Sequence, residues 1–203
     1  MLLEDLATHL GASRCLGCAR PGSLACRSCR GGLAPAPEIA APGPVDDVVA
    51  AWDYDGVARA LVLALKLRGR RPAASILAEA LAARVWAEGC GAQALVWVPG
   101  RRADIRRRGF DHARLLAQEL SSRLGLPSIS ALRRAGDRVD QTGLGAAQRR
   151  SNLAGAFVAE PVPTRVAIVD DVMTTGATLS EAGRALRGAG ARTVEGLVAC
   201  RAR

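Results

Sequence analysis

The sequence predicts an α/β protein with a central, mostly parallel sheet flanked by helices. The first observation is the β-branched apolar run at 166–169, which suits a strand that is buried on both faces. The second is a helical pattern of apolar residues that begins at Leu179, after only a short turn. The third is a strand, loop and helix in the same order between 94 and 120. Strands that lead through turns into helices indicate this architecture.

The other elements follow from periodicity and from the turn-forming residues between them. We expect a short helix and a metal-binding knuckle over 1–32, a Pro/Ala linker over 33–44 and the main domain over 45–203. The expected strands are 45–54, 94–98, 128–132, 156–159, 166–169 and, at the edge of the sheet, 192–200. The expected helices are 56–66, 72–88, one through Leu120 and one from Leu179.

Size and composition allow one such domain with a small appendage. The chain has 203 residues, 49% of them hydrophobic, and no apolar run approaches the ~20 residues that a membrane span needs. Residues 1–10 include Glu4 and Asp5 and no basic segment, which argues against a signal peptide. We therefore expect a cytoplasmic protein.

The formal net charge is +9, and Lys66 is the only lysine, so the other basic residues are arginines. Arginine binds phosphate through two hydrogen bonds, which makes anionic ligands or nucleic acid plausible partners. An alternative of about equal weight is that an Arg- and Ala-rich composition reflects coding bias. Aromatic residues make up only 3%, which argues against a platform of stacked rings for single-stranded nucleic acid.

Two Cys-x-x-Cys pairs, Cys15 with Cys18 and Cys26 with Cys29, predict a structural zinc site. Each pair can offer two thiolates to one metal ion, and two pairs complete a tetrahedron. The surrounding turn-forming residues cannot build a core without such a staple. Disulfides and a redox role are the alternatives, but a reducing cytosol disfavours the first and the tandem arrangement disfavours the second. Four thiolates leave no coordination position open for catalysis.

The stretch that follows 166–169 predicts a phosphate-binding turn. Asp170 and Asp171 stand where the strand is expected to end, and a turn of threonines around Gly176 follows. The amides of such a turn and of the next helix carry partial positive charge, and glycine lets the backbone approach a ligand closely. The acidic pair would repel phosphate and suits ribose hydroxyls better. The alternative is an ordinary turn in which Thr174 or Thr178 caps the helix.

The loop at 100–113 predicts a second anion site by the same physics. Its candidate side chains are Arg101, Arg102, Arg106, Arg107 and Arg108. For most of them a solvated basic loop is the expected alternative. His112 is either a general acid or base or, as we expect, a surface or capping residue. Lys66 and Arg68 are expected to cap the helix at 56–66, with a role near the ligand as the weaker alternative.

The run V-D-D-V-x-T-T-G-A-T at 169–178 resembles the signature of type I phosphoribosyltransferases, which bind 5-phosphoribosyl-1-pyrophosphate (PRPP). With the cysteine knuckle and the motifs K-L-R-G (66–69), V-P-x6-R-R-R-G-F-D-H-A (98–113) and Q-T-G-L-x4-R-x2-N-L-x2-A-F (141–157), most of the chain is similar to the ComF family, known for a role in competence and DNA uptake. Asp111 and His112 stand where that family often has Asn-Gln, so two amides are replaced by an acid and an imidazole.

The resemblance implies a role for each motif. Asp170 and Asp171 would bind the ribose hydroxyls, and the loop at 100–113 would face the pyrophosphate, with Arg101 and Arg108 ranked first. The 5-phosphate would be held by Thr174, Thr175, Gly176, Ala177 and Thr178. Mg²⁺ would bridge the pyrophosphate. A flexible loop over 132–152 would close over PRPP, with Arg133, Gln141, Arg149 and Asn152 as its candidate residues; the alternative is an ordinary surface loop.

Two functions from different classes remain open. The first is a phosphoribosyltransferase that moves the phosphoribosyl group of PRPP to an unknown acceptor, if it is active; no catalytic base is evident. The second is a non-catalytic DNA-uptake adaptor, in which the knuckle and the arginine-rich surface bind single-stranded DNA or a helicase partner. The two functions can coexist.

Overall fold

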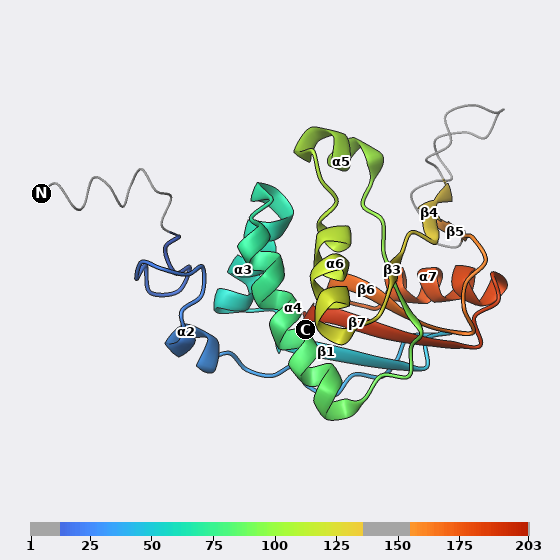
Figure 1. Cartoon of the computed structure of the whole chain (residues 1–203), viewed down its shortest axis with the longest axis horizontal. Coiled ribbons are helices and arrows are strands. Elements are labelled where there is room, and N and C mark those ends of the chain that lie inside the picture. The colour runs from blue at the N-terminus through green and yellow to red at the C-terminus, as the bar shows by residue number, and fades with distance from the viewer. Residues whose placement is uncertain (1–12, 136–154, 203) are drawn as a thin grey trace, which may run out of the picture.

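The computed structural model describes residues 13–135 and 155–202. Its centre is a sheet of five parallel strands in the order β1-β7-β6-β2-β3 (Figure 1). The strands are β1 (Asp47–Asp53), β2 (Ala94–Trp97), β3 (Ser128–Ile129), β6 (Arg165–Met173) and β7 (Thr193–Arg201). The predicted α/β fold with a parallel sheet is therefore confirmed.

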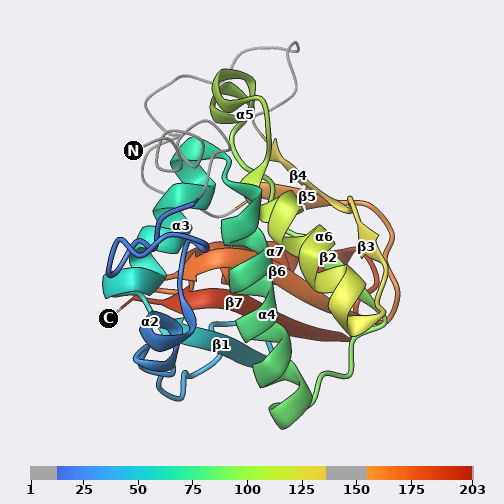
Figure 2. The ribbon, with the colours of Figure 1, turned by 60° about the vertical axis from the view of Figure 1, so that its left-hand side comes forward.

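Helices cover both faces of this sheet. Figure 2 shows α3 (Gly56–Arg68), α4 (Arg71–Glu88) and α6 (His112–Leu124) over one face and α7 (Ala177–Gly188) behind the other. Along β6, Ala167 and Val169 join the core beneath the three helices, whereas Val166 and Ile168 join the core beneath α7. This two-sided burial explains the continuous apolar run. No helix in the described ranges is long and apolar enough to cross a membrane.

Two expectations about the strands are wrong. Strand β7 lies inside the sheet, between β1 and β6, rather than at its edge. Its sequence alternates because Glu195 accepts a hydrogen bond from the Gly91 amide at 2.9 Å and because Gly196 lies beneath Val48, not because one face meets water. Strand β6 also continues past the acidic pair to Met173, since its pairing with β7 continues that far.

The arginine-rich loop and the segments around 132–159 contain further local structure. The first holds a short helix, α5 (Arg102–Arg108), where we expected an irregular loop. In the second, β4 (Leu132–Arg134) pairs antiparallel with β5 (Phe157–Ala159) in a separate ribbon beside α7. Of the candidate loop residues, Arg133 lies on β4, whereas Gln141, Arg149 and Asn152 lie outside the described residues.

The segment 33–44 packs against the domain along its length. The Ala36 amide donates to the Ala51 carbonyl on β1 at 3.2 Å, and the Ala36 side chain is buried. Farther along, Pro42 covers the turn before α7, where Gly176 has a φ of 77°. A Cβ on Gly176 would come within 2.7 Å of the Pro42 ring, so glycine is required both for the left-handed backbone and for this contact.

Candidate functional site

A cavity of about 240 Å³ lies at the carboxyl ends of β2 and β6. Strand β2 pairs with β6 only as far as Val169 of β6. The residues that follow β2 then turn away from the sheet. Helix α6, which comes after β2 and the short α5, and helix α7, which comes after β6, pack on opposite faces of the sheet, and the cavity lies between their starts. In open α/β sheets such a switch point is where ligands bind. The cavity is lined by Lys66, 98–101, Asp104, Arg108, His112, Arg134, 170–172 and Thr178.

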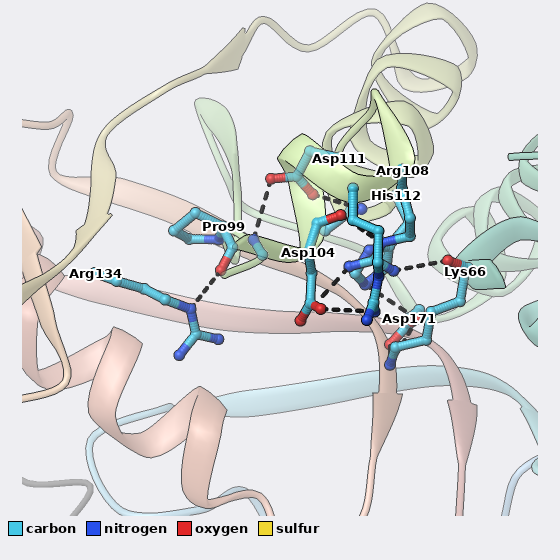
Figure 3. Close-up of polar contacts among 11 residues, drawn as sticks. Lys66, Pro99, Asp104, Arg108, Asp111, His112, Arg134 and Asp171 are labelled. Carbon is cyan, nitrogen blue, oxygen red and sulfur yellow. Dashed lines mark hydrogen bonds and ion pairs between the residues drawn. The ribbon is translucent and has the colours of Figure 1, made fainter. Parts of the chain in front are cut away.

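The acidic pair lies in this cavity, but its two members have different surroundings. As neighbours on one strand, Asp171 points toward the α3 and α6 layer and Asp170 toward the α7 layer. Asp171 is 2% exposed and contacts Lys66 and His112 (Figure 3). Asp170 is only partly buried, and its Oδ1 accepts a hydrogen bond from the Asp171 amide at 2.8 Å. Asp170 is therefore the more accessible carboxylate.

Burial shifts the pKa values of Asp170 and His112. Burial, together with the nearby charge of Asp171, raises the pKa of Asp170 to about 7. Burial also lowers the pKa of His112, against the opposing effect of Asp171, so the imidazole is neutral at neutral pH. Ligand atoms of His112, Asp170 and Asp171 lie within 4.8 Å of one another, which would also allow them to hold a metal ion.

Lys66 and His112 belong to the site, contrary to the roles we expected for them. The Lys66 Nζ lies 3.3 and 3.2 Å from the two carboxylate oxygens of Asp171. His112 is buried at the start of α6, with Nε2 3.3 Å from Asp171 Oδ2. The helix cap is Asp111, which accepts hydrogen bonds from the amides of Ala113 and Gly100, each at 3.1 Å. The one signal in the sequence was that an otherwise arginine-based chain keeps a single lysine.

Arg101 and Arg108, the two arginines that we ranked first as pyrophosphate ligands, both line the cavity, but they differ in exposure and in their hydrogen bonds. Arg101 precedes α5 and its side chain is exposed. The Arg108 side chain is only 11% exposed, and its guanidinium donates to two backbone carbonyls, those of Lys66 at 2.7 Å and Asp104 at 3.1 Å. Arg108 therefore joins α5 to the end of α3.

The threonine turn borders the cavity at one residue. Thr178, in the first turn of α7, is part of the cavity wall, whereas Thr174, Thr175, Gly176 and Ala177 are not. Gly176 is the N-cap residue of α7, and the threonine that accepts a hydrogen bond at this helix start is Thr175, from the Ala177 amide at 3.4 Å, rather than Thr174 or Thr178. The start of α7 brings the positive end of its dipole to the cavity. Arg201 holds the turn from outside by donating to the carbonyls of Met173 and Thr174.

Arg133 lies apart from these residues. It lines a neighbouring cavity of about 370 Å³ that shares Pro99, Gly100 and Arg134 with the first. Arg134 stands between the two cavities, where its Nε donates to the Pro99 carbonyl at 2.9 Å and its guanidinium lies over the Phe157 ring. The structure thus brings Asp170, Asp171, Arg101, Arg108 and Thr178 together and places Arg133 next to them.

The four cysteines form a second candidate site. Their sulfur atoms all lie within 4.8 Å of one another, and the thiols are free. Cys18 Sγ and Cys26 Sγ are 3.7 Å apart, far from a disulfide bond and close to the ~3.8 Å that ~2.3 Å Zn–S bonds give in a tetrahedron. Backbone amides of Cys26 and Cys18 lower the pKa of Cys15 to about 6, which favours a thiolate. The donor set fits a structural metal ion.

The segment that carries the four cysteines, 15–29, is called the cysteine module below, and it is packed into the domain. Leu24 and Ala25, between the two pairs, are buried in the core beneath α3 and α4. Gly17 lies against Val57 of α3, where a Cβ would come within 2.7 Å of the valine side chain. Arg30 reaches Glu79 on α4 at 2.8 Å. The position of the cysteines is therefore linked to the position of α3.

The chain is similar to several known proteins. A phosphoribosyl transferase domain matches residues 105–203. DNA utilization protein YhgH of Salmonella typhimurium is 34% identical over 96% of this chain and 87% of its own length. Competence protein F of Haemophilus influenzae is 38% identical, over 51% of this chain and only 48% of its own length. A solved structure described as that of the allosteric regulatory enzyme of purine biosynthesis aligns at 16% identity with a TM-score of 0.45, over 68% of this chain and 30% of that one.

The fold and the matched domain define a phosphoribosyltransferase-like protein. Because the similarity to YhgH extends over almost the whole chain, the protein belongs to the ComF family, within the type I phosphoribosyltransferase superfamily.

The cysteine cluster should bind one zinc ion that stabilises the whole domain. Chelation, or the substitution Cys15→Ser, is expected to lower the midpoint of thermal unfolding, because Leu24 and Ala25 are anchored by the turns that the metal closes. Native mass spectrometry would give the metal content, and Cys90→Ser, which lies outside the cluster, is the matched control. A metal-free protein with an unchanged unfolding midpoint would contradict the assignment.

Proposed function

We propose that the chain binds PRPP, or a related phosphoribosyl ligand, in the cavity between β2 and β6. The observation that supports this most is that both carboxylates, Thr178 at the start of α7 and a group of cationic side chains line one cavity. A sugar phosphate with a second phosphorylated arm needs these three kinds of group side by side. A purely structural acidic pair would not need a helix N-terminus and arginines around it.

In this proposal each part of the ligand meets a different wall. The ribose hydroxyls donate to the acidic pair, Asp170 and Asp171. The 5-phosphate lies at the turn formed by Thr174, Thr175, Gly176, Ala177 and Thr178, and the pyrophosphate lies along 99–101 near Arg101 and Arg108. Mg²⁺ bound with PRPP would help to neutralise the pyrophosphate. Arg133, Gln141 and Arg149 are proposed to lie over the bound ligand.

If the protein is active, the reaction is transfer of the phosphoribosyl group to an acceptor. The bond between ribose C1 and pyrophosphate breaks and a bond from C1 to the acceptor forms, through a state with positive charge on the sugar. The chain would contribute by holding the reactants in position and by screening the charge on the leaving pyrophosphate. Asp170, whose pKa is about 7, is the group best suited to carry a proton near the sugar.

We also propose that the protein acts in DNA uptake or DNA use, as the names of its relatives indicate for those proteins. The net charge of +9 would support a direct role as an adaptor for single-stranded DNA or for a helicase partner. This second function does not require catalysis and can share the chain with the PRPP site.

The first function predicts that PRPP with Mg²⁺ binds to the wild-type protein in a calorimetric titration. The double variant Asp170→Asn/Asp171→Asn should bind at least about 100-fold more weakly, since two hydrogen bonds to charged acceptors are lost. Asp47→Asn, at the amino end of the edge strand β1, is the control and should leave the affinity unchanged. Equal affinity of wild type and double variant would refute the assignment of the acidic pair.

The second function predicts salt-dependent binding of single-stranded DNA. The logarithm of the association constant should fall linearly with the logarithm of salt concentration, because arginine contacts release counterions from phosphates. Fluorescence anisotropy of a labelled oligonucleotide at several salt concentrations measures this slope. A slope near zero, or no binding at low salt, would exclude an arginine-based DNA surface.

A further inference from the structure

Both carboxylate oxygens of Asp171 lie close to Lys66, but only Oδ1 accepts a hydrogen bond from it, and the buried Oδ2 has no hydrogen-bond partner among the described residues. Oδ1 is 3.3 Å from the Lys66 ammonium, and Oδ2 is 3.2 Å from the same ammonium and 3.3 Å from His112 Nε2 (Figure 3). The Asp171 side chain is 3% exposed, whereas that of Lys66 is 40% exposed. Both residues line the cavity, and Lys66 is the more exposed partner of this ion pair.

The backbone of Lys66 is fixed as firmly as its side chain. Lys66 lies in the last turn of α3, and its carbonyl accepts a hydrogen bond of 2.7 Å from Arg108 Nη1. Arg108 in turn donates to the Asp104 carbonyl and is nearly buried. The lysine is thus held at its carbonyl by Arg108 and at its ammonium by Asp171. An ammonium has three donor hydrogens, so contact with one carboxylate leaves at least one for a ligand.

Lys66 is one of the four cations that set the charge of the cavity. The lining contains four cationic side chains, Lys66, Arg101, Arg108 and Arg134, and three acidic ones, Asp104, Asp170 and Asp171. The formal charge is therefore +1 with the neutral His112, and it would be zero without Lys66. Arg108 and Arg134 already donate to backbone carbonyls, which leaves Lys66 and Arg101 as the cations best placed to meet an anion.

We propose that Lys66 contacts the pyrophosphate arm of the ligand and that Asp171 acts by positioning its ammonium. Asp170, the accessible carboxylate, then receives the ribose hydroxyls, and Arg108 positions the end of α3. This inference rests on the proposed function and revises one assignment within it: Asp171 holds Lys66 instead of binding a ribose hydroxyl, so Asp170 alone makes the acidic contact with the sugar. It makes Lys66, together with Arg101, a residue that distinguishes a pyrophosphorylated ribose from a plain ribose phosphate.

The test uses two probes, PRPP and ribose 5-phosphate, each titrated with Mg²⁺ by calorimetry. Lys66→Met keeps the length of the side chain and removes the charge, and it should weaken PRPP binding by about 10- to 100-fold while ribose 5-phosphate binding changes by less than about twofold. Lys66→Arg should restore part of the PRPP affinity. Arg68→Met is the matched control, because Arg68 is an exposed cation of the same helix turn outside the cavity lining.

A double-mutant cycle separates positioning from direct contact. Asp171→Asn should weaken PRPP binding in the wild-type background and have little further effect in the Lys66→Met background. The double variant also removes both charges, so no buried carboxylate is left unpaired and folding is preserved, which circular dichroism would check. The same loss from Asp171→Asn in both backgrounds would show that Asp171 itself binds the ligand and would overturn the inference.

The outcomes also separate this inference from the proposed function. If the wild-type protein binds PRPP and Lys66→Met binds it equally well, the inference is wrong and the PRPP site stands. If Lys66→Met weakens the binding of PRPP and of ribose 5-phosphate by the same factor, Lys66 does not contact the pyrophosphate arm specifically, and the inference is again wrong. If the wild-type protein binds neither probe, the inference and the proposed function both fail.

Discussion

The site depends on one ion pair, between the buried Asp171 on β6 and the partly exposed Lys66 at the end of α3. A carboxylate that is almost fully buried is costly unless a cation and further hydrogen bonds compensate it. Lys66 supplies the cation and His112, at the start of α6, supplies a second polar contact. Because the three residues come from three elements, the pair fixes the end of α3 and the start of α6 relative to the carboxyl end of β6.

The same helix links this pair to the cysteine module. Val57, at the start of α3, lies against Gly17 of the cysteine turns, and Lys66, at the other end, reaches Asp171. The residues between the cysteine pairs share the core of α3 and α4. A metal ion in the module would therefore stabilise the helix that carries Lys66, which gives the module a physical role in the site without any direct contact with the ligand.

The sequence predicted those features that short-range patterns encode. The run at 166–169 predicted a strand that is buried on both faces, and β6 is such a strand. The two Cys-x-x-Cys pairs predicted that four sulfur atoms lie close together, and they do. Features set by long-range packing were missed. Lys66 and Asp171 are 105 residues apart, and nothing local to Lys66 shows that its helix ends beside β6. His112 looked like a surface residue for the same reason, and β7 looked like an edge strand because Glu195 finds its partner 104 residues away.

The most direct test of this account is the coupling between Lys66 and Asp171 in the folded protein. Urea unfolding at pH 7 of the wild type, Lys66→Met, Asp171→Asn and the double variant gives the four free energies of unfolding that the cycle needs. The account predicts a coupling of about 1–2 kcal/mol, because loss of Lys66 leaves the buried Asp171 carboxylate without its cation, while the partial exposure of Lys66 limits the value. Single changes that cost under about 0.5 kcal/mol and simply add would show that the pair does not organise the site.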